Sequence, residues 1–185
     1  MKIKTLFCSQ TLFRFTPRTT SDDAPLVVVG PALLRKSFYT NARLVQRKLG
    51  RQYRSIAHIV LPLSMNNRRR AGRLQRTLEA YRAAIRKAPD VFAYGRGAHA
   101  FLLMNGQQRL IRHLYLFAPK SRLRHTAAQC ERIYFFNPLR NRHRLGVLHN
   151  LTIVETRLSL RPKLSLLAAT LRDYLRHAHV SPVSS

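Results

Sequence analysis

The chain has 185 residues, with 34 Lys or Arg against 7 Asp or Glu, which leaves a formal net charge of +27 at pH 7. Hydrophobic residues make up 45% of the chain, so the composition excludes a disordered basic tail and allows one domain with a folded core. This charge excess favours a polyanionic partner. The 27 Arg against 7 Lys fit structured RNA, because guanidinium groups bind phosphates and stack on bases, and they fit equally a GC-rich genome, whose codons favour Arg.

Residues 1–20 have the composition of a targeting segment, with four Lys or Arg, six Ser or Thr and no acidic residue. This profile is typical of a mitochondrial transit peptide and predicts a location in the mitochondrial matrix. The alternative is a basic arm that stays on the mature protein, and the composition leaves both open. Residues 21–31 form a predicted linker with a short apolar run, closed by Gly30 and Pro31.

Two segments show the spacing of amphipathic helices. Between residues 32 and 49, apolar side chains recur at steps of three and four, and Gly50 stands where a C-cap glycine is expected. A second helix is predicted to begin after Asn66 or Asn67 and to continue through Lys87. Both helices are basic on the remaining face, and we expect their apolar faces to pack together.

Residues 91–160 are predicted to hold a small antiparallel sheet. Asn105-Gly106 lies between two apolar stretches and predicts a hairpin, although the apolar spacing over 99–117 also fits a helix. The segments Arg132–Phe136 and Leu151–Leu160 are expected to be strands, the latter because it is rich in β-branched residues. Leucines at helical spacing after Pro162 predict a C-terminal helix.

The expected fold class is therefore α+β: two basic amphipathic helices, a small antiparallel sheet and a C-terminal helix, with an extended N-terminal arm. A single RNA-binding domain is expected over residues 32–178, followed by a short tail, 179–185.

Basic residues cluster most densely between residues 35 and 87, where 15 Lys or Arg accompany a single acidic residue, Glu79. A second basic cluster flanks the segment around Tyr134, Phe135 and Phe136, whose rings could stack on bases or pack into a core, and we favour the core. The candidate RNA-binding residues are Arg35, Lys36, Arg43, Arg47, Lys48, Arg51, Arg54, Arg68, Arg69, Arg70, Arg73, Arg76, Lys120, Arg122, Arg124, Arg140, Arg142 and Arg144.

Patterns that carry catalysis or metal binding are not found in the sequence. The two cysteines, Cys8 and Cys130, form neither a disulfide framework nor a zinc-finger spacing, and no apolar run is long enough to cross a bilayer. No G-x-S-x-G motif, Walker loop or HExxH motif occurs. We therefore expect no enzymatic activity, no cofactor, no metal and no small-molecule substrate.

An Arg-rich, Cys-poor chain of this length with an acid-free leader resembles mitochondrial ribosomal proteins, particularly the lineage-specific ones of protists. The resemblance implies a structural component that braces rRNA and contacts neighbouring ribosomal proteins. The alternative functions are an accessory factor in mitochondrial RNA processing or editing and a small RNA-modifying enzyme.

Overall fold

The structure is a computed structural model of the chain. It describes residues 4–8, 11–15, 24–30, 35–53, 55–59, 61, 66–104, 109–117, 130–138, 150–156 and 163–178. All structural statements below concern these residues.

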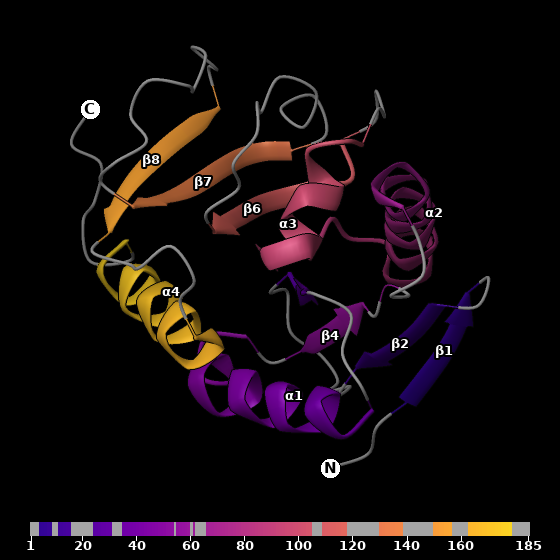
Figure 1. Ribbon diagram of the computed structural model, residues 1–185, viewed down its shortest axis with the longest axis horizontal. Coiled ribbons are helices and arrows are strands. Elements are labelled where there is room, and N and C mark those ends of the chain that lie inside the picture. The colour runs from indigo at the N-terminus through magenta and orange to yellow at the C-terminus, as the bar shows by residue number, and fades with distance from the viewer. Residues whose placement is uncertain are drawn as a thin grey trace.

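One sheet of eight strands forms the centre of the protein, in the order β1-β2-β4-β3-β5-β6-β7-β8 (Figure 1). The strands are β1 Lys4–Cys8, β2 Thr11–Phe15, β3 Leu26–Val29, β4 Ile56–Ile59, β5 Asp90–Tyr94, β6 Ile111–Phe117, β7 Cys130–Pro138 and β8 Leu151–Thr156. The six strands from β4 to β8 in this order are all parallel. At the other edge, β2 pairs antiparallel with both β1 and β4.

Helices cover both faces of this sheet. They are α1 Arg35–Leu49, α2 Asn67–Ile85, α3 Gly95–Phe101 and α4 Leu164–Ala178. Val45 of α1 and Leu171 of α4 belong to one apolar cluster, while Leu74 of α2 and Phe101 of α3 belong to the other. Figure 1 shows α1 beside α4 and away from α2. The fold is therefore a three-layer α/β arrangement.

Strands β3 and β5, at the centre of the sheet, are largely apolar because both of their faces are buried. Every residue of β3 and of β5 is buried. In β5, Val91 and Ala93 face the α2 and α3 side, whereas Phe92 and Tyr94 face the α1 and α4 side. Successive side chains thus enter two different cores, as the twofold period of a strand requires.

The predicted helices are confirmed. The helices expected at 32–49, after Asn66 and after Pro162 correspond to α1, α2 and α4. The side-chain oxygen of Asn66 accepts a hydrogen bond from the backbone N–H of Arg69 at 2.9 Å, so Asn66 is the N-cap of α2. Strands also occur at the two segments from which we expected them, as β7 and β8.

The predicted α+β class with a small antiparallel sheet is wrong. The two expected strands pair with each other in parallel as β7 and β8. The expected hairpin is also wrong, because α3 precedes residues 105–108 and β6 follows them, and β6 pairs in parallel with β5. The hairpin was predicted from the dipeptide Asn105-Gly106 alone, whereas the packing of whole elements determines how the strands pair.

Two segments that we assigned outside the domain contribute strands to the sheet. Residues 26–29, within the predicted linker, are β3, whose neighbours are β4 and β5. Residues 4–8 and 11–15, within the predicted leader, are β1 and β2. The targeting role of residues 1–20 stays a prediction, and cleavage after them would remove β1 and β2 while leaving the six parallel strands.

A buried carboxylate joins the amino ends of β5 and β6. Asp90 is 1% exposed, and its two oxygens accept hydrogen bonds from Nε and Nη2 of Arg112, both at 2.8 Å. The Tyr53 hydroxyl donates to Asp90 at 2.9 Å, and Nδ1 of His113 lies 3.4 Å from it. Burial acts to raise the pKa of Asp90, but its bonds to Arg112 and His113 outweigh burial and hold that pKa below its ordinary value.

We expect Asp90→Asn to lower the free energy of unfolding by about 2–4 kcal/mol, because Arg112 loses its partner and Tyr53 its charged acceptor. The control is Asp173→Asn, whose exposed carboxylate pairs with Arg172 at 2.7 Å and should contribute less than about 1 kcal/mol. Urea denaturation of both variants measures the difference.

The same pair also gives a pH dependence. Because the pKa of Asp90 is lowered by folding, its stabilisation is complete above the unfolded-state pKa of about 3.9 and is lost as the pH falls through the folded-state pKa. The stability gap between wild type and Asp90→Asn should therefore narrow below about pH 4. A gap that stays constant down to acid unfolding would contradict this assignment.

Candidate functional site

The turn between β5 and α3 requires a left-handed backbone conformation. Gly95, directly after the last residue of β5, has φ = 55° and is exposed. This is the left-handed region, which costs little for glycine and about 1–2 kcal/mol for a residue with a β-carbon. The chain therefore passes from a buried strand into a helix within a single exposed residue.

Close contact with the end of β3 fixes this turn. A β-carbon placed on Gly97 would lie 2.5 Å from the carbonyl oxygen of Val29 and 2.9 Å from that of Gly30. A β-carbon on Gly30 would lie 2.5 Å from the ring and the hydroxyl of Tyr94. Only glycine fits at 97, since the atoms in the way are backbone, and so the first turn of α3 lies directly on the carboxyl end of β3.

This turn lies at the topological switch point of the sheet, where successive strands are added first on one side and then on the other. From β3 the chain moves to β4 on one side, and from β5 it moves to β6 on the other, while β3 and β5 are neighbours. In open α/β sheets, ligands bind outside the carboxyl ends of the strands at such a switch point. The carboxyl ends of β3 and β5 are therefore the candidate functional site.

The Tyr94 side chain lies at this site. It is buried, it stacks on Phe92 with ring centroids 5.4 Å apart, and it hydrogen-bonds with the Asn41 side chain of α1. Burial raises the pKa of Tyr94 to about 12, which the bond with Asn41 only partly offsets. Tyr94 is therefore a neutral phenol at physiological pH and a possible hydrogen-bonding group beside Gly95.

The fold matches solved structures of α/β hydrolases. A protein of unknown function from Agrobacterium tumefaciens, placed among the α/β hydrolases, superimposes with a TM-score of 0.62 at 10% identity, over 97% of each chain. The esterase domain of a Rhodothermus marinus protein has a TM-score of 0.59 at 12% identity, over 96% of this chain and 97% of that one. Est1E from Butyrivibrio proteoclasticus has a TM-score of 0.57 at 10% identity, over 97% and 99%.

No family model matches the sequence, and no curated protein matches it either. The likeness is one of fold, and the fold of this chain is that of the α/β hydrolases. In these enzymes the nucleophilic serine of a G-x-S-x-G motif stands on a strained turn between a strand and a helix. In this chain the turn between β5 and α3 has the sequence Ala93-Tyr94-Gly95-Arg96-Gly97, with glycine in place of the serine of that pattern.

These findings correct the functional expectation. The predicted resemblance to mitochondrial ribosomal proteins is wrong, as is the expectation of a non-enzymatic RNA-binding component, because the structures that share this fold are hydrolases and esterases. The alternative functions in RNA processing and RNA modification receive no support either. RNA binding was predicted mainly from the net charge of +27, and net charge bears on the surface of a protein and its association with other molecules, not on its fold.

Acidic residues are scarce where a hydrolase triad would need them: in the described parallel strands, Glu155 of β8, opposite Asn137 of β7, is the one acidic residue near a carboxyl end. In α/β hydrolases the triad follows the order Ser, Asp or Glu, His along the chain. The segments 118–129 and 139–149, which follow β6 and β7, contain no Asp or Glu, and residue 137 near the end of β7 is Asn. His125, His143 and His149 lie in these two segments, outside the described residues.

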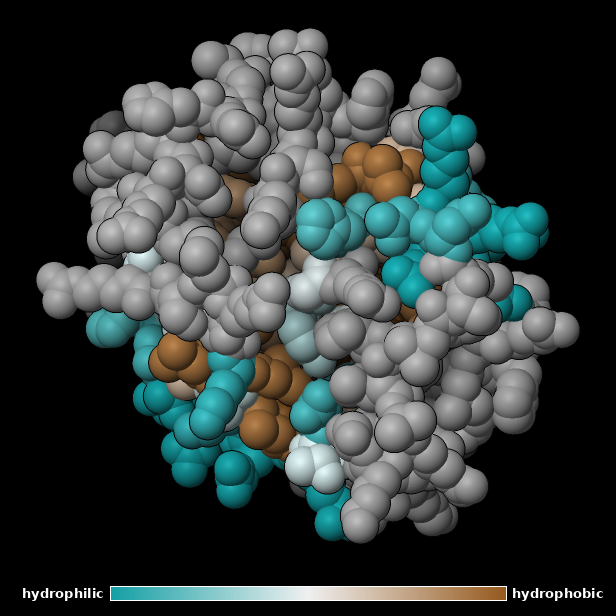
Figure 2. Space-filling view, in the orientation of Figure 1, coloured by the Kyte–Doolittle hydropathy of each residue, from teal (hydrophilic) through white to brown (hydrophobic). Residues whose placement is uncertain are grey.

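The structure separates the predicted RNA-binding residues. Arg35, Lys36, Arg43, Arg47 and Lys48 are on α1, with Arg51 just after it, and Arg68, Arg69, Arg70, Arg73 and Arg76 are on α2. The two helices lie on opposite faces of the sheet, so their apolar faces do not pack together as we expected. Figure 2 accordingly shows separate hydrophilic areas, one over α2 and one over α1 and α4. Outside the described residues lie Arg54, Lys120, Arg122, Arg124, Arg140, Arg142 and Arg144.

Burial changes the interpretation of some of these residues. Arg70 is only 6% exposed, and its Nη1 donates to the Asn67 side chain. Its side chain therefore packs within the protein and is not presented to a partner. Phe135 and Phe136 are buried in opposite cores, and Tyr134 packs against the α1 and α4 side, as the core interpretation of these rings predicted.

In the described ranges, no group of three or more His, Cys, Asp or Glu is arranged to hold a metal ion. None of the four helices there is long and apolar enough to span a membrane.

We expect Gly97→Ala to lower the free energy of unfolding by about 1–3 kcal/mol, because the new methyl group collides with the backbone of β3. Gly72→Ala is the matched control: Gly72 is in α2 with no atom in the way of a β-carbon, and its replacement should stabilise by up to about 1 kcal/mol. Urea denaturation compares the two. Equal effects of the two replacements would show that the turn does not press on β3.

Proposed function

We propose that this protein is a hydrolase that acts on a small ester or acyl compound, bound at the carboxyl ends of β3 and β5. The observation that carries the proposal is the exposed left-handed turn at Gly95, held against the end of β3 at the switch point of an α/β-hydrolase sheet. Several proteins with this fold are esterases, such as the Rhodothermus marinus domain and Est1E.

Backbone groups at this turn suit the carbonyl oxygen of such a compound. In α/β hydrolases one donor to the oxyanion is the backbone N–H of the residue after the nucleophile, and the other comes from the loop after β3. The corresponding positions here are Arg96, in the first turn of α3, and the loop that begins at Gly30. Arg96 adjoins Gly97, whose close approach to the carbonyl groups of Val29 and Gly30 brings the start of α3 to the end of β3.

Gly95 determines which kind of hydrolysis is possible at this site. Because residue 95 has no side chain beyond hydrogen, no acyl-enzyme can form on it. The reaction we propose is a single displacement: a water oxygen adds to the ester carbonyl, the bond to the alcohol oxygen breaks, and the alcohol leaves with a proton from the water. Its products are the free acid and the alcohol.

The first experiment measures hydrolysis of p-nitrophenyl acetate and p-nitrophenyl butyrate by the full chain. We expect saturable release of p-nitrophenol above the uncatalysed rate, without the initial burst that an accumulating acyl-enzyme gives. Saturable binding without product release would contradict the hydrolytic part of the proposal. If the esters neither bind nor release p-nitrophenol, the proposed site itself is wrong.

A thiol introduced at the turn locates the reaction. We expect the Gly95→Cys variant to be alkylated by iodoacetamide at residue 95 and to lose ester hydrolysis when alkylated, because the added group fills the site. The native Cys130 should react slowly, since burial raises the pKa of its thiol. Peptide mass spectrometry identifies the labelled residue.

Gly72→Cys is the matched control for this labelling, since Gly72 is also an exposed glycine, lies in α2 and has no atom in the way of a β-carbon. Alkylation at residue 72 should leave hydrolysis unchanged. If alkylation of the two variants reduces hydrolysis equally, the activity does not arise at the Gly95 turn.

A further inference from the structure

The Tyr94 side chain contacts two other elements at the candidate site, the end of β3 and helix α1. Tyr94 is the last residue of β5, and since Val29 of β3 pairs with Ala93, Gly30 is the neighbour of Tyr94 across the two strands. A β-carbon on Gly30 would lie 2.5 Å from the hydroxyl oxygen of Tyr94 and 2.7 Å from its Cε1 atom. The Tyr94 ring therefore occupies the space that a side chain at residue 30 would take.

The hydroxyl of Tyr94 links this ring to α1, the helix that follows β3. It hydrogen-bonds with the side chain of Asn41. This bond lowers the pKa of Tyr94, as a hydrogen bond donated to the phenol oxygen does, so the Asn41 amide is the donor. One side chain thus holds both the end of β3 and the helix after it.

Buried rings keep the Tyr94 side chain in this position. Its ring stacks on Phe92 with centroids 5.4 Å apart, and Phe92 meets Phe117 edge to face at 5.3 Å. Phe92 is fully buried, and Phe117 is 2% exposed. Because interiors are closely packed, the Tyr94 ring cannot turn away from Gly30 without displacing these neighbours.

This arrangement bears on the proposed reaction, whose donors to the carbonyl oxygen come from Arg96 and from the loop that begins at Gly30. Both donors must face one oxygen atom, and a displacement of about 1 Å can cost roughly a hundredfold in rate. We propose that Tyr94 is a positioning residue for this hydrolysis, because it holds the end of β3 and α1 against the Gly95 turn. This role rests on the proposed function.

The test compares Tyr94→Phe, Asn41→Ala and the double variant in hydrolysis of p-nitrophenyl acetate. Tyr94→Phe keeps the ring and removes only the hydroxyl. Each single variant should lower kcat about five- to tenfold, the factor that corresponds to one net hydrogen bond, and should change KM less than about twofold. The double variant should be no slower than the single variants, because all three lack the same bond.

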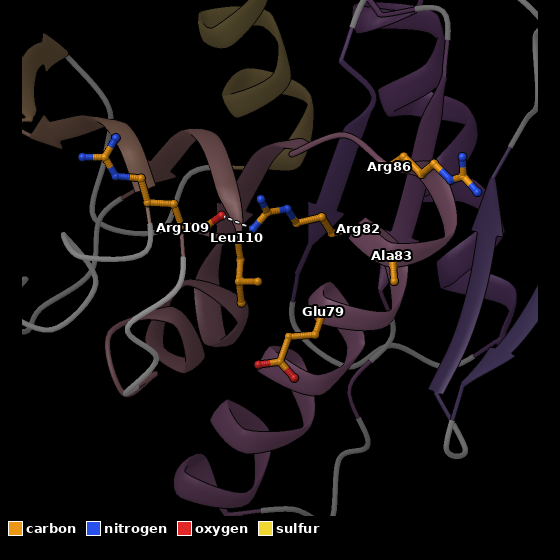
Figure 3. A pocket seen from close by; sticks show the side chains of 6 residues that line it. All are labelled: Glu79, Arg82, Ala83, Arg86, Arg109 and Leu110. Carbon is orange, nitrogen blue, oxygen red and sulfur yellow. Dashed lines mark hydrogen bonds between the residues drawn. The ribbon is translucent and has the colours of Figure 1, made fainter.

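Tyr81→Phe is the matched control. Like Tyr94, Tyr81 is buried, has a pKa raised by burial to about 12 and hydrogen-bonds with one side chain, that of Ser55. It is on α2, which leads into the amino end of β5, and Ser55 directly precedes β4, so this pair is at the edge opposite the candidate site. Figure 3 shows the same end of α2, where Arg82 donates to the carbonyl oxygen of Arg109. Tyr81→Phe should leave kcat unchanged.

Amide hydrogen exchange provides a second measurement that does not depend on hydrolysis. In the peptide from the end of β3 to the start of α1, exchange should be faster in Tyr94→Phe and Asn41→Ala than in the wild type, and unchanged in Tyr81→Phe. Equal kcat values in Tyr94→Phe and Tyr81→Phe, or a double variant slowed by the product of the two single effects, would overturn the role of Tyr94. If the wild type hydrolyses no ester, the proposed function is wrong, and unchanged exchange in Tyr94→Phe would show separately that Tyr94 does not hold the turn.

Discussion

The contact on which the rest of the structure depends is the one between the carboxyl end of β3 and the first turn of α3. Gly97 lies against the carbonyl groups of Val29 and Gly30, and these are backbone atoms that cannot move aside singly. Any larger residue would push α3 off the sheet, and with it Ala98 and Phe101, which are fully buried in the core that α2 completes. The exposed turn at Gly95 is thus rigid because the core beneath it is rigid.

Strand β5 carries a chemically distinctive residue at each end. At the amino end of β5, the buried Asp90 gathers Arg112, His113 and Tyr53 into one hydrogen-bonded group. At its carboxyl end, Tyr94 and Gly95 form the candidate site. All five residues of the strand are buried, so a shift of register by one residue would place Asp90 in an apolar core. The buried carboxylate therefore helps to set where the turn falls.

Helices α1, α2 and α4 could be predicted from the sequence, whereas α3 and the strand order of the sheet could not, and the two cores explain why the sheet was missed. One face of α2 is buried, so Leu74, Leu78 and Tyr81 recur at helical spacing and are visible as a pattern. A parallel strand is buried on both faces, so it shows no alternation, and β3 and β4 are only four residues long. We consequently predicted β3 as part of a linker and assigned no element to β4.

The candidate site could not be recognised from a sequence motif, because residue 95 is glycine. The G-x-S-x-G pattern requires a serine, whereas the backbone geometry that positions it requires only glycine-permitting turns and a close approach, which Gly95 and Gly97 supply. An apolar strand followed at once by two glycines one residue apart was the available signal. Fold and chemistry are separable here: the strand order makes the carboxyl ends of β3 and β5 the candidate ligand site, whereas any reaction there depends on the side chains around residue 95. The excess of arginine is separable from both, since it lies on the helices of both faces and depends on neither strand order nor turn geometry.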